Sequence, residues 1–186
     1  PGPVSIIAEG TVEVTDAAGL VKGLVSPAPD AVFLRQTKAT LPSPAVLDLA
    51  DQVTAESPPV LDRLHRLMDE LHRKVAYVIG ATDAHTTAAE AFADGQGVCQ
   101  DHAHIFIGAT RAMGLPSRYV TGYLVTGEGA SSTAAHAWAE TLVPDLGWVG
   151  FDVANCKCPT DHYVRVAGGI DAAGVTPIRG SRRGGD

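Results

Sequence analysis

The sequence predicts an α+β fold in which a helix that carries Cys99 packs on an antiparallel sheet that carries His136 and Asp152. Apolar residues recur at helical spacing between residues 43 and 113. Alternating patterns typical of strands follow from residue 117 onward. A run of helices followed by a run of strands is typical of α+β domains, in which the helices gather on one face of the sheet.

Length and composition indicate one globular domain. The chain has 186 residues, of which 45% are hydrophobic and 19% are charged. A net charge of −7 argues against a nucleic-acid-binding protein, because the one basic stretch is at residues 179–183. No apolar run approaches the roughly 18 residues that span a membrane, and no signal-peptide pattern opens the chain. Three cysteines do not suggest a disulfide framework, so we expect a reducing, cytoplasmic setting.

Residues 1–40 are predicted to be extended. Residues 11–15 alternate between polar and apolar side chains, and residues 32–34 could form another short strand. We interpret residues 1–40 as an extended remnant of a β-rich N-terminal region. A poorly ordered lead-in is the alternative.

Two helices are predicted after residue 42. Ser43-Pro44 and Ser57-Pro58 each place a capping residue before a proline at the first helical position. In the second helix, apolar residues fall at helical spacing: Leu61, Leu64, Met68, Leu71 and Val75.

A third, shorter helix is predicted to open at Thr87, whose spacing from Glu90 is that of a capping box, and to stop at Gly95. The helix that begins at Cys99 then runs to Gly114. One face of this helix is expected to be buried: Cys99, Ala103, Phe106, Ile107, Thr110 and Met113.

Three strands are predicted after this helix, at residues 117–125, 134–142 and 148–154, and a turn joins the last two as a hairpin. If Leu142 lies near Trp148, even-numbered residues face each other across the hairpin. His136 and Asp152 then lie on the same side, within reach of each other. Residues 126–133 are small and polar, so we expect a mobile loop there that could act as a lid.

These elements bring together a nucleophile, a base and an orienting acid. Cys99 stands in the first turn of its helix, where unpaired N–H groups and the helix dipole favour the thiolate. His136 would exchange a proton with it, and Asp152 would hold the imidazole ring. Each residue also has a simpler interpretation. Cys99 could pack under the helix start, His136 could be a hydrogen-bonded core residue, and Asp152 could be a strand-end acid.

At these residues the chain resembles the bacterial transglutaminase-like superfamily of cysteine-protease-like proteins. The resemblance rests on residues 81–83 (Ala-Thr-Asp), 97–101 (Gly-Val-Cys-Gln-Asp), 114–123 (Gly-Leu-Pro-Ser-Arg-Tyr-Val-Thr-Gly-Tyr), 136–140 (His-Ala-Trp-Ala-Glu) and 147–152 (Gly-Trp-Val-Gly-Phe-Asp). It implies a papain-like core with Cys99, His136 and Asp152 as a catalytic triad. It also implies that residues 41–186 form a transglutaminase-like catalytic domain, which in typical members follows a β-rich domain.

Three departures from the family pattern bear on the site. His102 stands where the family usually has an aromatic residue, which adds a titratable group close to the nucleophile. After Asp152 the chain reads Val-Ala-Asn instead of the common Pro-Thr-Asn. Residues 170–173 lack the aromatic residue that is often found there.

The chemistry that these residues support is acyl transfer. The Cys99 thiolate would attack an amide or ester carbonyl, and its own backbone N–H is a natural donor to the oxyanion. A second donor could come from Gln96 or Tyr77. Asp101 is expected to brace the loop near the site, and Trp138 to form core or cleft wall.

Cys156 and Cys158, with Asp161 and His162 nearby in the chain, could ligate a metal. However, Cys-x-Cys is not the usual zinc spacing. We expect free thiols there, or a strained local pairing under oxidation. The sequence therefore predicts no metal site and no cofactor.

The expected function is that of a cysteine-dependent hydrolase, a peptidase or amidase, that acts on a peptide or protein substrate through a thioester. The alternatives are a transglutaminase-type acyltransferase with the same triad and a catalytically idle binding module. We expect no nucleic-acid or membrane partner, and the sequence leaves the oligomeric state open.

Overall fold

The computed structural model describes residues 7, 9–25, 28–55, 58–126 and 135–176. Within them, four α-helices come first: α1 (Pro44–Thr54), α2 (Val60–Lys74), α3 (Ala88–Asp94) and α4 (Cys99–Ala112). An antiparallel sheet follows, in the spatial order β5-β4-β3-β6. Its strands are β3 (Ser117–Leu124), β4 (His136–Val143), β5 (Gly147–Phe151) and β6 (Tyr163–Gly169). The predicted α+β fold, with a cysteine-bearing helix packed on an antiparallel sheet, is confirmed.

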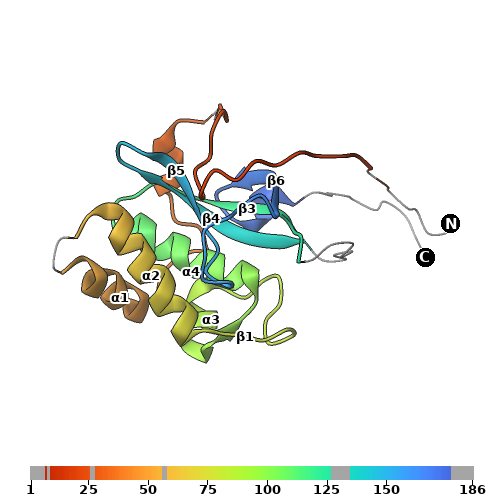
Figure 1. Ribbon diagram of the computed structural model, residues 1–186. Helices are drawn as coiled ribbons and strands as arrows, with labels where there is room; N and C mark the ends of the chain where they lie inside the picture. Colours follow the sequence, from red (N-terminus) through yellow and green to blue (C-terminus); the bar gives the residue numbers. More distant parts are fainter. Residues whose placement is uncertain (1–6, 8, 26–27, 56–57, 127–134, 177–186) are drawn as a thin grey trace, which may run out of the picture.

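Helix α4 is the centre of the domain. It contacts α1, α2 and α3 as well as β3 and β4, and Figure 1 shows it between the other helices and the sheet. Every residue from Asp101 to Arg111 is buried, so the prediction of a single buried face was too narrow. The close packing depends on Gly108, where a Cβ would collide with the carbonyl of Thr40. Cys99, at the helix start, is only half-buried.

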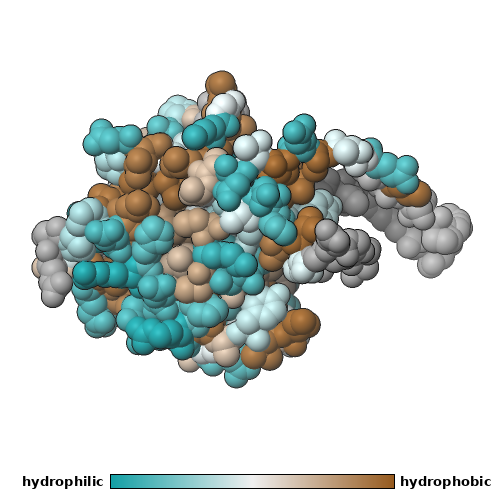
Figure 2. Space-filling view, in the orientation of Figure 1, coloured by the Kyte–Doolittle hydropathy of each residue, from teal (hydrophilic) through white to brown (hydrophobic). Residues whose placement is uncertain are grey.

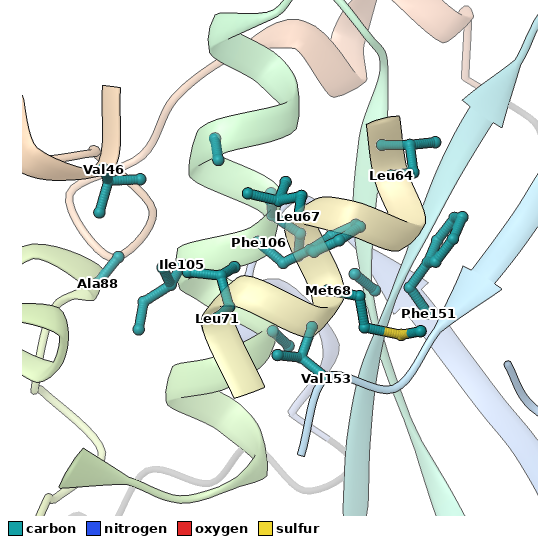
Figure 3. Close-up of a cluster of buried hydrophobic side chains, with 14 of the residues drawn as sticks. Val46, Leu64, Leu67, Met68, Leu71, Ala88, Ile105, Phe106, Phe151 and Val153 are labelled. Carbon is teal, nitrogen blue, oxygen red and sulfur yellow. The ribbon is translucent and has the colours of Figure 1, made fainter. Parts of the chain in front are cut away.

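The apolar core lies between α2, α4 and the sheet. Helix α2 turns four side chains inward, as Figure 3 shows: Leu64, Leu67, Met68 and Leu71. They meet Phe106 of α4 and Phe151 of β5, whose rings stack with centroids 5.2 Å apart. Burying an apolar side chain of this size contributes about 1.5–3 kcal/mol. The outward faces of α1 and α2 are mainly hydrophilic (Figure 2), as amphipathic helices require.

The predicted start of the first helix is confirmed, whereas the second helix begins later than predicted. Ser43 caps α1, and its hydroxyl accepts a hydrogen bond from the backbone N–H of Val46 at 3.4 Å. Helix α2 begins at Val60 instead of Pro58, directly after Pro59, which offers no side-chain cap. Ser57, the predicted cap, lies outside the described residues.

The segment that leads into α4 is tightly specified. Thr87 and Glu90 form the predicted capping box at the start of α3, and Gly95 ends that helix in the left-handed region at φ 65°. Two short strands then pair in parallel, β1 (Ala76–Tyr77) with β2 (Gln96–Gly97), so that Tyr77 lies opposite Gly97. Because Gly97 is two residues before Cys99, this pair brings Tyr77 beside the start of α4.

The hairpin has the predicted register, since Leu142 pairs with Trp148. Strand β5 ends at Phe151, three residues before the predicted end at residue 154. The sequence did not predict β6, which pairs with β3 across the sheet. Apart from Thr126, the predicted lid lies outside the described residues.

The N-terminal strand predictions were wrong where the structure describes them. Residues 11–15 form no strand, and residues 32–34 belong to the 3-10 helix η1 (Asp30–Leu34). Pro29 starts this turn with φ −58°, and Phe33 packs edge-on against Trp148 with ring centroids 5.3 Å apart. The burial of Phe33 against the sheet thus favours a 3-10 turn over a strand in this segment. In Figure 1 the N-terminal segment runs over the side of the sheet that is turned away from the helices.

That outer sheet face carries a buried ion-pair network. Glu140 accepts hydrogen bonds from Arg118 at 2.6 Å and from Arg165 at 2.8 Å. The Arg118 guanidinium also lies 3.9 Å from the ring centroid of Trp148. Charges are retained in such a place only when they are paired in this way.

Among the described helices, none combines the length and apolarity needed to cross a membrane.

Candidate active site

His136 and Asp152 meet at one end of the hairpin. His136 is the first residue of β4, and Asp152 directly follows the last residue of β5. The Nε2 atom of His136 lies 2.7 Å from Oδ2 of Asp152. The Asp152 side chain is fully buried, and that of His136 is 12% exposed. The contact that strand alternation and the hairpin register predicted is therefore present.

The Asp152 carboxylate is held by more than the histidine. The Tyr163 hydroxyl and the Asn155 side-chain amide each donate to the same Oδ2 atom at 2.7 Å. The backbone N–H of Asn155 donates to Oδ1 at 3.2 Å. Burial raises the pKa of Asp152, but the hydrogen bonds from His136, Tyr163 and Asn155 outweigh it and lower the pKa below its usual value. Asp152 therefore stays charged at neutral pH.

Cys99 and His136 line the same cavity. Because Nε2 of His136 is taken by Asp152, Nδ1 is the nitrogen that can face the thiol. Burial lowers the pKa of His136, but hydrogen bonds to Asp152 and Cys99 outweigh burial and raise the pKa to about 9. The ring is thus a cation at neutral pH, next to a sulfur at the positive end of a helix.

Tyr77 is the other polar side chain at the thiol. Burial raises the pKa of its hydroxyl, and so do the negative charge of Cys99 and a hydrogen bond to it. Gln96, the alternative donor considered from the sequence, is exposed on β2 and does not line the cavity at Cys99. Tyr77 does not line that cavity either, but of the two candidates it alone has a pKa that responds to the Cys99 sulfur.

Asp101 braces the turn that presents Cys99. Its Oδ2 atom accepts the backbone N–H of Val98 at 2.8 Å and the Thr82 hydroxyl at 2.6 Å. A Cβ at Gly97 would lie 2.7 Å from the Cβ of Asp101, so glycine is needed there. These contacts fix the backbone immediately before the nucleophile, because Asp101 is fully buried and cannot move aside.

A cavity of about 580 Å³ opens beside Cys99 and His136. Small apolar residues form much of its wall, including Ala137 of β4 and Ala172 and Val175 of the 3-10 helix η2 (Ala172–Val175). None of the described residues that line it is Asp, Glu, Lys or Arg. Trp138 does not line it, because it lies on the outer sheet face, edge-on to Tyr163 with centroids 5.5 Å apart.

The remaining cysteines lie apart from this site. The Cys156 thiol donates to Asp69 of α2 at 3.2 Å, and Cys158 Sγ lies 3.6 Å from His65 Nε2. Burial and the contact with Asp69 raise the pKa of Cys156 to about 11, which favours an unreactive thiol. Within the part of the chain that the structure describes, no three His, Cys, Asp or Glu side chains gather in a way that could hold a metal ion.

Sequence reasoning missed two members of the site, Tyr163 and Asn155. Asn155 follows Asp152 by three residues, a spacing at which a side chain can turn back to the acid. Tyr163 carries no such local signal, because it reaches Asp152 only through the pairing of β6 with β3.

Comparison with known proteins shows the family of the chain. A model of the Transglutaminase-like superfamily matches residues 47–153. An uncharacterized protein of Mycobacterium leprae is 35% identical over 113 residues, which cover 58% of this chain and 39% of the relative. An uncharacterized protein of Mycobacterium bovis is 33% identical over 132 residues, which cover 66% of this chain and 42% of the relative. The chain thus spans about two fifths of the length of these relatives.

Two solved structures share the fold. A candidate cysteine protease from Cytophaga hutchinsonii has a TM-score of 0.68 and 27% identity, and the match covers 86% of this chain and 54% of that one. The periplasmic domain of TgpA from Pseudomonas aeruginosa has a TM-score of 0.55 and 23% identity, with 75% and 53% covered.

Proposed function

Because the chain belongs to the transglutaminase-like superfamily, we propose that it is a cysteine-dependent hydrolase that acts through a triad of Cys99, His136 and Asp152. The observation that carries this proposal is the position of His136. The ring contacts Asp152 through Nε2 at 2.7 Å, and it lines the same cavity as Cys99, whose sulfur helps to raise the pKa of the ring. A catalytically idle module needs none of these groups, and their convergence at a cavity therefore favours an enzyme.

The reaction would begin at the sulfur. The Cys99 thiolate attacks an amide or ester carbonyl carbon, and the carbonyl oxygen becomes an oxyanion. The donors that we propose for it are the backbone N–H of Cys99 and the Tyr77 hydroxyl, whose pKa responds to Cys99. His136 gives its Nδ1 proton to the leaving amine or alcohol, the bond to the leaving group breaks, and a thioester on Cys99 remains.

Water would then complete the cycle. His136, now neutral, takes a proton from the water that attacks the thioester, and the acid product leaves as the thiolate re-forms. Asp152 keeps the ring oriented in both halves of the reaction, since its carboxylate stays charged. The substrate we propose is a peptide or protein, whose acyl side chain would enter the cavity beside Cys99, where none of the described lining residues is Asp, Glu, Lys or Arg.

Transfer to an amine is the second candidate. The same thioester yields a transglutaminase-type product when an amine takes the place of water, and the family match favours this chemistry as a real alternative. Both reactions need a free Cys99, which agrees with the reducing, cytoplasmic setting that we propose.

The test is cysteine labelling. Iodoacetamide should alkylate Cys99 rapidly below about pH 7, because a neighbouring imidazolium keeps the sulfur ionised there. Cys156, whose pKa is raised to about 11, is the internal control and should react slowly. The rapid reaction should be lost in a His136→Ala variant. Equal, slow labelling of all three cysteines would refute both enzymatic functions.

A second measurement separates hydrolysis from transfer. A glutamine peptide is incubated with the protein, with and without an added primary amine, and the products are weighed by mass spectrometry. Conversion of glutamine to glutamate or cleavage of the peptide in both samples supports the hydrolase. A product that carries the amine supports the acyltransferase.

A further inference from the structure

His102 lies one turn behind Cys99 on α4 and is 1% exposed. Its Nδ1 atom lies 2.9 Å from the carbonyl oxygen of Val98, the residue that precedes Cys99. Its Nε2 atom lies 3.0 Å from the carbonyl oxygen of Val75, at the end of α2. Its ring stacks on that of Tyr77, with centroids 6.1 Å apart. Both ring nitrogens therefore face hydrogen-bond acceptors that have no proton to give.

A neutral imidazole cannot satisfy this arrangement. It has one N–H donor and one nitrogen with a lone pair, so one ring nitrogen would direct its lone pair at a carbonyl oxygen at hydrogen-bond distance. The Val98 carbonyl also accepts the backbone N–H of His102 at 3.1 Å, so the atom left without a partner would be that ring nitrogen. The imidazolium ring has two donors, one for each carbonyl oxygen. A buried polar atom without a partner costs about 1–3 kcal/mol, and hydrogen bonds from charged donors are stronger than neutral ones.

One acidic residue of the same helical turn is buried. Asp101, the next residue toward the helix start, is fully buried, and its Oδ1 atom has no hydrogen-bond partner within the described residues. From β1 the ring faces Tyr77, and at the end of α2 it faces the carbonyl of Val75. The titratable residues of α4 within three positions of it are Cys99, Asp101 and His104.

His104 of the same helix shows the opposite case. It is equally buried, but its Nε2 atom accepts the backbone N–H of Ala172 at 3.2 Å, and its Nδ1 atom has no partner within the described residues. Burial lowers the pKa of His104 to about 4. His104 is thus neutral, whereas His102 lies between two hydrogen-bond acceptors.

We propose that His102 is a buried imidazolium that ties the start of α4 to the end of α2 and stabilises the Cys99 thiolate. It is a positioning residue, because it touches the turn before Cys99 and the ring of Tyr77 and no part of the cavity. Residues three apart on a helix have Cβ atoms about 5–6 Å apart, so His102 and Cys99 are neighbours on the first turn of α4. The effect on Cys99 rests on the proposed function, whereas the charge itself does not.

Nitrogen-15 NMR tests the charge without any activity. The histidine-labelled wild-type protein is observed at about pH 7, above the usual histidine pKa of about 6.5, with ring signals assigned through bonds from the backbone. Both ring nitrogens of His102 should carry a proton, whereas His104 should carry a proton on one nitrogen. A single protonated nitrogen on His102 would overturn the proposal.

Alkylation tests the effect on the thiolate. Iodoacetamide labelling of Cys99 is followed by mass spectrometry between about pH 4 and pH 9 in the wild type, in His102→Phe and in His104→Phe. His102→Phe keeps a ring to stack on Tyr77 but has no donor. It should slow alkylation about tenfold near pH 6, the effect of one pKa unit, and leave the rate near pH 9 unchanged.

His104→Phe is the matched control. It replaces a neutral ring of equal burial on the same helix and should leave the pH profile unchanged. Fast wild-type labelling with no change in His102→Phe would overturn the role of His102 and leave the proposed function intact. Slow wild-type labelling at Cys99 would refute the proposed function and the thiolate effect together, while the NMR result would still decide the charge.

Discussion

The two halves of the candidate site are held in place by different forces. The acid–base half, on the sheet, depends on hydrogen bonds: Oδ2 of Asp152 accepts three of them, from His136, Tyr163 and Asn155, each at 2.7 Å. The nucleophile half depends on packing. Cys99 starts α4, and the helix is buried from Asp101 to Arg111 between the other helices and the sheet.

This difference teaches that the two halves should respond differently to mutation. Hydrogen bonds at the edge of a sheet can be removed singly, because the backbone around them is held by the strand ladder. Side chains packed around a central helix cannot be removed singly in the same way, because the cavity left behind destabilises the whole domain. Changes on the sheet should therefore alter activity, and changes on the helix should alter stability.

The largest effect is expected from His136→Ala. Removing the base should lower the acyl-transfer rate about 10⁴-fold or more, as in other triads in which one member is lost. The melting temperature should change little, because Asp152 keeps the hydrogen bonds from Tyr163 and Asn155. Steady-state rates and thermal unfolding measure the two quantities. His162→Ala, an exposed histidine with no contact to the site, should leave both unchanged.

Phe106→Ala should change the stability instead of the rate, and by a smaller free energy. Phe106 is fully buried in α4 and stacks on Phe151. Its truncation should lower the free energy of unfolding by about 3–5 kcal/mol. The rate per folded molecule should stay close to that of the wild type. Chemical denaturation with a parallel activity assay checks this, with the half-exposed Leu47→Ala as control. A stable but inactive variant would contradict the division between the two halves.

The smallest effect is expected from Tyr163→Phe, which removes one donor from Asp152 and leaves the ring in place. A carboxylate with fewer donors is a stronger base, so it should hold the proton of His136 more tightly. The pKa of His136, about 9 in the wild type, should therefore move upward. The upper pH limit of activity should move with it, and the rate near neutral pH should fall about threefold to tenfold.

The pH profile of Cys99 alkylation gives this shift directly. Tyr123→Phe on β3 is the matched control, because Tyr123 is exposed and makes no contact with Asp152. A downward shift of the upper limit would mean that Tyr163 supports the histidine by some route other than the carboxylate.

Local patterns predicted much of this molecule. Alternation along the two strands, with Leu142 taken to lie near Trp148, predicted that His136 and Asp152 share one side of the hairpin, and the observed register agrees. The capping box at Thr87 and the glycine stop at Gly95 are encoded within a few residues, and both are present. The helix that begins at Cys99 was also predicted from residues within it and next to it.

What could not be predicted depends on contacts between distant parts of the chain. Residues 32–34 have strand-like composition but form a turn, because Phe33 packs on Trp148 across more than a hundred positions. Tyr163 reaches Asp152 only once β6 has paired with β3. The burial of α4 on all sides depends on Gly108, which lets Thr40 approach, and no periodicity within the helix reports this.

The central place of α4 has a consequence for how the protein fails. Backbone amides of a helix enclosed on every side exchange with solvent only when the molecule opens as a whole. The position of the sulfur is tied to the same event, since Asp101 and its neighbours anchor the first turn to that enclosed helix. The first turn of α4 is therefore not expected to open on its own while the rest of the domain stays native. Catalytic competence and the slowest-exchanging amides should therefore vanish at one temperature, without a folded, inactive species between them.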